Sequence, residues 1–212
     1  MNVWQSGVSK PLGQFLENPG DLSAIQSIYE CYSNDILVQK AVEKNLFKDP
    51  RFKELFESWY TPTPFSIDEL LRLPVESFGY LYATHMKVNN LDVNFISPFK
   101  EKNVLSYLWL RAGHVHDVCH IMSGFDTTFM GELGLKGFEL GQYLSASTAA
   151  ILGGGLLAVT SRQPELVEPI FDMIVEGYVR GKKFPLLTAI KWDQEWKTPL
   201  SDLKRKYQIP TV

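Results

Sequence analysis

The feature that most constrains this chain is the helical spacing of its apolar residues, which recurs through nearly its whole length. In DLSAIQSIYECY, residues 21–32, apolar positions recur three or four apart behind an aspartate that suits a helix N-cap. Strand-like alternation is nearly absent, and no internal repeat occurs. We therefore predict an all-α fold.

Capping residues and prolines in the sequence mark where the remaining helices are expected to begin and end. Ser66 and Glu69 form a capping box, and Pro74 suits the first turn of the next helix. We expect further helices over residues 66–73, 74–88, 101–120, 126–143, 164–181 and 186–197. The 212 residues suit one principal domain, 1–212, with residues 1–60 as a candidate small N-terminal helical unit.

Composition excludes several classes of protein. The formal net charge of -3 gives no basic footprint for nucleic acid. Two lone cysteines, Cys31 and Cys119, form no disulfide framework and suit a reducing compartment. The first residues lack the features of a secretory signal or a transit peptide. We expect a cytoplasmic protein.

Residues 140–161 carry no charge, and a run of that length can span a bilayer. The run nevertheless contains several polar side chains and the triplet Gly153–Gly155, which weakens a helix. We prefer a buried or lipid-lining helix over a membrane span.

Candidate metal ligands are concentrated in HVHDVCHIMSGFDTTFMGE, residues 114–132. On a helix His116 and His120 share a face, and Asp117 borders it. The turn at Gly124 reverses the chain, so that Glu132 on the next helix can face the histidines. Mixed nitrogen and oxygen ligands suit a divalent metal, zinc foremost, with iron, manganese and magnesium as alternatives.

The competing interpretation is a surface helix with two exposed histidines and a glutamate that favours the helix dipole. His114 and Cys119 point away from the cluster and are expected to be bystanders. His85 is expected to be a packed or surface histidine.

The helix after the turn has two distinct faces. One carries Glu132, Lys136 and Glu139. The other is a glycine stripe, formed by Gly131, Gly134, Gly137 and Gly141. Each helical glycine costs about 1 kcal/mol relative to alanine, so something must pack very close to the stripe. A neighbouring helix is the default, and a long thin ligand is the alternative.

The motif His116-Asp117-x-x-His120, eleven residues and then Glu132, followed by the register of Lys136, Glu139 and Gln142, resembles the Coq-four family of coenzyme Q (ubiquinone) biosynthesis proteins. The resemblance continues to KWDQEWKTPLSDLKRKYQI near the C-terminus and extends upstream through LPVESFGYLYATHMKVNNL, so that it covers roughly residues 50–210. One departure is that the family's Arg-Tyr-Arg-Glu is here Arg111-Ala-Gly-His114.

The resemblance implies that His116, Asp117, His120 and Glu132 hold the metal, and that the substrate is a polyprenylated hydroxybenzoate that loses its ring carboxyl group. We expect Lys136 to pair with Glu132 or to attract an anionic head group, together with Arg111. An apolar cavity for the tail is expected along Gly134, Gly141 and Tyr143 and the uncharged run.

The resemblance also implies peripheral association with a membrane surface, on the matrix side of the mitochondrial inner membrane in a eukaryote. Other quinone-biosynthesis enzymes and a homodimer are further expected partners. Basic residues near the C-terminus could meet lipid head groups, although a solvated face explains them equally simply: Arg180, Lys182, Lys183, Lys204, Arg205 and Lys206.

Two alternatives stay open at this point. The first is a non-catalytic scaffold that binds a prenyl lipid. The second is an HD-type metal phosphohydrolase, which would use His116 and Asp117 with His85 and Asp172 and would leave His120 and Glu132 without a role.

Overall fold

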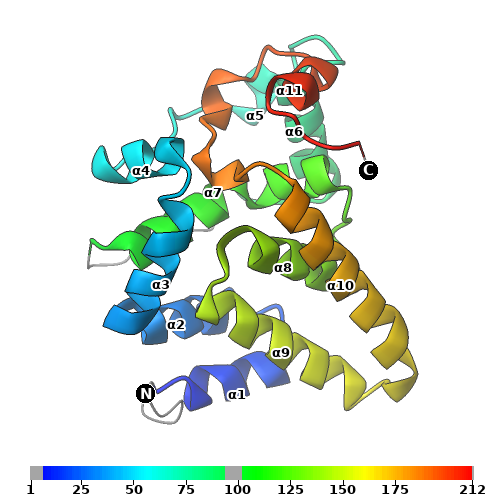
Figure 1. Ribbon diagram of the computed structural model, residues 1–212. Coiled ribbons are helices and arrows are strands. Elements are labelled where there is room, and N and C mark those ends of the chain that lie inside the picture. The colour runs from blue at the N-terminus through cyan, green and yellow to red at the C-terminus, as the bar shows by residue number, and fades with distance from the viewer. Residues whose placement is uncertain (1–6, 94–101, 212) are drawn as a thin grey trace.

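The computed structural model describes residues 7–93 and 102–211, and every regular element in these ranges is helical, which confirms the all-α prediction (Figure 1). The α-helices are α1 (Ser9–Glu17), α2 (Leu22–Ser33), α3 (Ile36–Leu46), α4 (Pro50–Glu57), α5 (Ile67–Leu70), α6 (Phe78–Val88), α7 (Val104–Ser123), α8 (Phe129–Tyr143), α9 (Ala146–Thr160), α10 (Val167–Lys183) and α11 (Leu200–Lys206). Short 3-10 turns lie at η2 (Pro164–Leu166), η3 (Leu187–Ala189) and η4 (Trp192–Gln194).

Helix α7 crosses the middle of the molecule, and the other helices pack around it (Figure 1). At one end α1 and α2 share an apolar cluster with α9, while α3 and α4 pack on the first half of α7. At the other end α6 packs on the second half of α7 together with the C-terminal segment. The second half of α7 is therefore enclosed, and it carries the candidate ligands.

The connection between α7 and α8 is sharply defined. Gly124 takes a left-handed conformation, with φ of 79°, and its N–H donates to the carbonyl of His120 at 2.8 Å. The hydroxyl of Thr128 then caps α8 by accepting from the N–H of Gly131. This turn reverses the chain where the sequence predicted it.

Two predicted helices are shorter in the structure. The side chain of Ser77 accepts from the N–H of Tyr80, so α6 begins at Phe78 rather than at residue 74. Residues 74–77 form a turn instead, because both the N–H and the hydroxyl of Ser77 donate to the carbonyl of Pro74. The segment 66–73 contracts to α5, and Ser66 makes no side-chain cap hydrogen bond there.

The prediction of a helix over residues 186–197 is wrong, because this segment forms η3 and η4. Side chains from elsewhere capture its backbone groups. Arg111 donates to the carbonyls of Thr188 and Ile190, and the side chain of Gln142 accepts from the N–H of Leu187. These tertiary hydrogen bonds replace the helical ones.

The uncharged run 140–161 is divided between two helices. Leu144, with φ of 49°, ends α8, and Ser145 precedes α9. Within residues 7–93 and 102–211, no helix is both long enough and apolar enough to cross a bilayer.

Candidate metal centre

Three candidate ligands lie together on α7. The Nε2 atoms of His116 and His120 are 3.3 Å apart. Ligand atoms of these two histidines and of Asp117 all lie within 4.8 Å of one another. His120 and Asp117 are buried, whereas His116 is partly exposed. The spacing along α7 therefore produces the predicted convergence.

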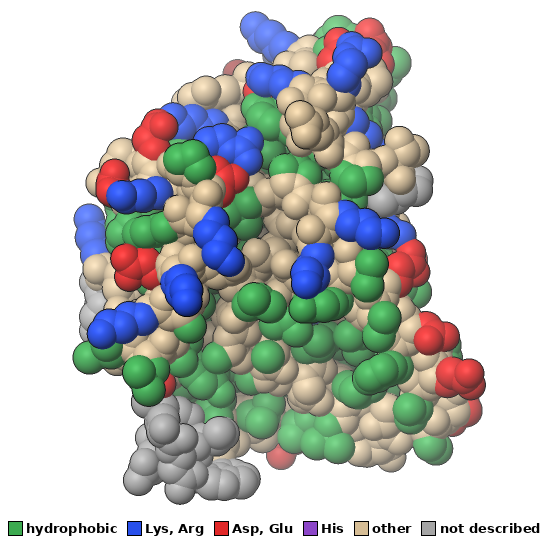
Figure 2. Space-filling model, viewed as in Figure 1, with side chains coloured by type: hydrophobic (Ala, Val, Ile, Leu, Met, Phe, Trp, Pro, Cys, Tyr) green, Lys and Arg blue, Asp and Glu red, His purple; other side chains and the backbone are tan. Residues whose placement is uncertain are grey.

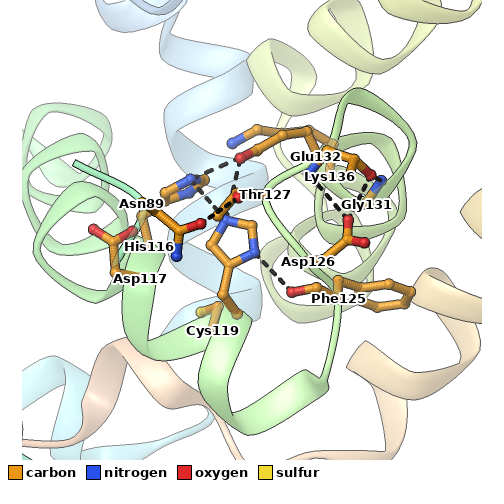
Figure 3. A network of polar contacts seen from close by, with 12 residues as sticks. Asn89, His116, Asp117, Cys119, Phe125, Asp126, Thr127, Gly131, Glu132 and Lys136 are labelled. Atoms are coloured by element: carbon orange, nitrogen blue, oxygen red, sulfur yellow. Dashed lines mark hydrogen bonds and ion pairs between the residues drawn. The ribbon is translucent and has the colours of Figure 1, made fainter. Parts of the chain in front are cut away.

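Glu132 reaches this group from α8 (Figure 3). Its Oε1 lies 3.2 Å from Nε2 of His120, and its Oε2 lies 3.6 Å from Nε2 of His116. The turn at Gly124 thus places a carboxylate opposite the two imidazoles, as the sequence predicted.

The other ring nitrogen of each histidine is held by an acceptor. Nδ1 of His120 lies 2.9 Å from the carbonyl oxygen of Phe125, and Nδ1 of His116 lies 3.4 Å from Oε1 of Glu139. A neutral imidazole has one donor and one acceptor nitrogen, so Nδ1 donates in both rings. In this neutral form the Nε2 lone pairs would face each other and the Glu132 carboxylate, an arrangement that favours a bound cation, whereas without a cation a proton on His116 fills the same place.

This donor set fits a divalent metal. Two nitrogens bound tetrahedrally to zinc, each at about 2.0 Å, are roughly 3.3 Å apart. The separation of the two Nε2 atoms is 3.3 Å. Acceptors on the outer nitrogens of ligating histidines are a common feature of metal sites, because they fix the tautomer and the ring orientation.

A buried ion pair supports the cluster from α8. Nζ of Lys136 donates to Oε2 of Glu139 at 2.8 Å, while the other oxygen of Glu139 faces His116. The contact that Lys136 makes is therefore with Glu139, and the expected direct pairing with Glu132 is not the one formed. The reason is spacing, because Glu139 follows Lys136 by three residues and lies beside it on the helix surface.

The carboxylates and His116 shift one another's pKa values. Burial by itself would lower the pKa of His116, but its hydrogen bonds with Glu132 and Glu139 raise it to about 10. Burial would raise the pKa of Glu139, but Lys136 and His116 lower it to about 2. The pKa of Glu132 is likewise held well below its ordinary value by the two histidines, against the effect of burial. The carboxylates therefore favour a positive charge beside them, supplied by a proton on His116 or by a bound cation.

A cavity of about 470 Å³ borders the cluster at Asp117. Arg111 and His114 line it, together with aromatic walls formed by Trp59, Phe65, Tyr82, Trp192 and Trp196. Burial, followed by the charge of Arg111, lowers the pKa of His114 to about 4, so this imidazole is neutral near pH 7. His114 is thus outside the ligand group, as expected, but it lines this cavity.

Arg111 is 1% exposed, and its Nε and Nη2 donate to two backbone carbonyls. No carboxylate within the described ranges forms an ion pair with it. A buried guanidinium without a counter-ion is well suited to an anionic group.

Gly134, Gly137 and Gly141 of the glycine stripe form a helix contact, whereas Gly131 lies against Asp126 in the turn before α8. A Cβ on Gly141 would lie 2.5 Å from the carbonyl oxygen of Tyr178, and one on Gly134 would lie 2.8 Å from Met173. Gly177 and Gly181 on α10 approach the backbone of α8 equally closely. The backbone of α10 thus occupies the space in which a tail cavity was expected along Gly134 and Gly141.

Tyr143 is also not open to a ligand, because it is buried in the apolar cluster of α3, α4 and α7. An apolar groove of about 520 Å³ lies instead on another face of α8, between α8, α9 and α10. Its lining includes Leu140, Leu144, Ala149, Leu152, Val175 and Tyr178.

Three residues near the cluster were not predicted from the sequence as part of it. Glu139 holds His116, and His85 and Asn89 approach from α6, with His85 Nε2 lying 3.4 Å from Oδ1 of Asp117. The available signal was helical spacing, since His85 and Asn89 are four residues apart and Glu139 follows Glu132 by two turns.

Asp172, which the phosphohydrolase alternative requires, is exposed on α10. In the described parts of the chain, no contact joins it to the histidines. That alternative therefore loses its second aspartate, although His85 does approach Asp117.

Fold and site together define a class of all-helical proteins with a histidine–carboxylate cluster on a helix–turn–helix. The sequence model of the family described as coenzyme Q (ubiquinone) biosynthesis protein Coq4 matches residues 17–212. The chain belongs to this family, which the sequence resemblance predicted.

Individual relatives agree with this assignment. The mitochondrial ubiquinone biosynthesis protein COQ4 homolog of Mus musculus is 24% identical over 94% of this chain and 79% of its own length. The COQ4 homolog 2 of Paramecium tetraurelia is 23% identical over 93% of this chain and 90% of its own. A crystal structure of a ubiquinone biosynthesis protein from Nostoc punctiforme superposes with a TM-score of 0.82 at 28% identity, covering 96% of this chain and 97% of that one.

Proposed function

We propose that this protein binds a polyprenylated hydroxybenzoate beside a divalent metal and promotes loss of the ring carboxyl group during ubiquinone biosynthesis. The observation that carries the proposal is the convergence of two Nε2 atoms, 3.3 Å apart, on the Glu132 carboxylate. His116, Asp117, His120 and Glu132 would hold the metal, which supplies Lewis acidity toward a carboxylate or phenolate oxygen.

The head group has a suitable place in the cavity beside Asp117. Aromatic walls can stack on a planar ring, and Arg111 can neutralise its carboxylate. Arg111 is fixed by two carbonyls, so its charge is positioned before the ligand arrives. The low dielectric of this buried site strengthens the attraction.

The tail has a path along α8. Glu132, Lys136, Leu140 and Leu144 follow one another at four-residue spacing, so this face of the helix changes from polar to apolar over about 18 Å. Its apolar end forms part of the groove between α8, α9 and α10. Each buried CH2 group contributes about 0.8 kcal/mol, so even a short prenyl chain gains substantial affinity there.

Replacement of the carboxyl group by oxygen would require more than this chain's side chains. Zinc has no redox chemistry, so an oxidative step needs molecular oxygen with iron, or a redox partner among the quinone-biosynthesis enzymes. Simple decarboxylation needs no such partner.

The metal is tested by measuring metal content in the purified protein and in His120→Ala. We expect the parent to bind about one divalent ion per chain and the variant to lose most of it, because one nitrogen ligand and its bond to Phe125 are removed. Equal metal content in the two proteins would remove His120 from the ligand set.

The reaction is tested with a carboxyl-labelled prenyl hydroxybenzoate and iron-loaded or zinc-loaded protein. We expect the parent to release labelled CO2 and the Arg111→Met variant to release far less of it at equal protein concentration. Binding of the prenyl ligand without release of CO2 would favour the non-catalytic scaffold.

A further inference from the structure

His85 approaches the cluster from a third helix. Its Nε2 is buried and makes no hydrogen bond, and Oδ1 of Asp117 lies 3.4 Å away. The ring of His85 also lies beside that of His120, with a centroid separation of 5.6 Å. A buried polar atom without a hydrogen bond is uncommon in folded proteins and calls for an explanation.

The tautomer of His85 follows from Asn89. Nδ2 of Asn89 donates to the carbonyl oxygen of His85 at 2.9 Å and lies 3.4 Å from Nδ1 of the same residue. Oδ1 of Asn89 accepts from the hydroxyl of Thr127 at 3.0 Å. Flipping the amide would place its oxygen against the His85 carbonyl, so Nδ2 is the atom that faces Nδ1.

This arrangement makes Nδ1 of His85 an acceptor. In a neutral imidazole the other nitrogen, Nε2, then carries the proton and is a donor. A protonated nitrogen has no lone pair to offer a metal. Asp117, the residue that His85 faces, belongs to the group of ligand atoms that lie within 4.8 Å of one another.

We propose that His85 is a positioning residue that donates from Nε2 to Asp117 and orients the carboxylate toward the metal, without binding the metal itself. The proposal rests on the metal site proposed above. Outer hydrogen bonds of this kind hold a carboxylate ligand in a single orientation. The chain Thr127–Asn89–His85–Asp117 also ties α6 to the turn that sets the position of α8.

The experiment is a titration of the metal-stripped full chain with Co²⁺, followed by its visible absorption spectrum. His85→Phe removes the donor, and His85→Gln retains an N–H that can reach Asp117. Thr84→Val is the matched control, because Thr84 is the neighbouring residue on α6 and its hydroxyl is likewise buried without a partner.

We expect His85→Phe to weaken Co²⁺ binding by about 10- to 100-fold, His85→Gln to recover most of the affinity, and Thr84→Val to match the parent. The absorption spectrum of saturated His85→Gln should match that of the parent, because the ligand set is unchanged. Asn89→Leu removes the group that fixes the tautomer but leaves the side chains of His85 and Asp117 in place, so it should weaken binding by a smaller factor, and it provides the test if His85→Phe does not fold.

Parent-like Co²⁺ affinity in His85→Phe and Asn89→Leu would overturn the proposal, since His85 would then be a packing residue. A changed spectrum in His85→Gln, with a loss as large as that of His120→Ala, would also overturn it and make His85 a ligand. Failure of the parent itself to bind Co²⁺ would instead overturn the metal site, and this inference with it.

Discussion

At the scale of single residues, the pair formed by Lys136 and Glu139 shows how a helix can carry ionised groups into a core. Glu139 is 2% exposed, yet its two oxygens accept from Lys136 and from His116. Removing one member would leave the other charged and unpaired, which usually costs more than the pair contributes. The pair is therefore a requirement for the geometry of His116.

This pair predicts a pH dependence of stability. The pKa of Glu139 is about 2, lowered from 4.5 by Lys136 and His116 despite burial. A carboxyl group whose pKa is lowered by folding stabilises the fold above its unfolded pKa and loses that contribution as the pH falls toward the folded value. We expect the free energy of unfolding to fall by on the order of 3 kcal/mol between pH 5 and pH 2 from this group.

Urea unfolding at several pH values measures this effect. Glu139→Gln should make the dependence between pH 5 and pH 2 less steep, leaving the part that Glu132 contributes, whereas Glu43→Gln, at an exposed position on α3, should keep the parent's slope. A parallel pH profile in Glu139→Gln and the parent would contradict the assignment.

Some residues of the cluster could be predicted from spacing within one helix or one turn, whereas others depend on how separate helices pack. Spacing on one helix predicted His116, Asp117 and His120, and one turn predicted Glu132. Helical spacing places His85 and Asn89 on one face of α6, but it does not show that this face meets Asp117, because that contact depends on how α6 packs on α7. The environment of Lys136 and Glu139 likewise depends on other helices, because α9 packs on α8 and Tyr29 of α2 interacts electrostatically with Lys136.

At the scale of elements, the contact between α8 and α10 depends on the absence of side chains. A Cβ on Gly137 would press on the backbone of Ile174, which cannot move aside as a flexible side chain can. On Gly153 of α9, by contrast, a Cβ would meet nothing within 4 Å. Replacement by alanine is therefore expected to have opposite effects on stability at Gly137 and at Gly153.

We expect Gly137→Ala to destabilise the protein by about 2 kcal/mol or more, because the helices must separate. Gly153→Ala should stabilise it by about 0.5–1 kcal/mol through helix propensity. Urea unfolding of both variants measures the difference. A loss of stability in both, or in neither, would show that the close approach does not control this contact.

Helical periodicity predicted most elements because their apolar faces are buried by neighbouring helices. It failed over residues 186–197, where Arg111 and Gln142 take backbone groups that a helix would use. It also misplaced the start of α6, which a turn and the cap at Ser77 determine. Such hydrogen bonds depend on residues far away in the sequence or on competing local turns.

At the scale of the whole molecule, apolar side chains gather over α9 and α10 (Figure 2). Exposed apolar residues of α9 and α10 include Leu157, Phe171, Val175 and Val179, and Val175 also lines the groove between α8, α9 and α10. Lysines and arginines lie above this face in the same view. An apolar surface with a basic border is suited to peripheral contact with an anionic bilayer.

We expect the protein to bind anionic phosphatidylserine vesicles and Val175→Asp to weaken this binding several-fold, because the substitution places a charge in the apolar lining of the groove. Val88→Asp is the matched control, since Val88 is exposed at the end of α6, away from the groove. Vesicle co-sedimentation measures both. Equal sedimentation of the two variants and the parent would place any membrane contact elsewhere.

In the proposed metal centre, the buried Lys136 of α8 would also set the ion valence that the site favours. Asp117, Glu132 and Glu139, counted as carboxylates, contribute three negative charges, and Lys136 contributes one positive charge, which leaves two negative charges when the histidines are neutral. A divalent ion brings this sum to zero. Oxidation of that ion to the trivalent state would leave one positive charge in excess, which a single anionic substrate could neutralise.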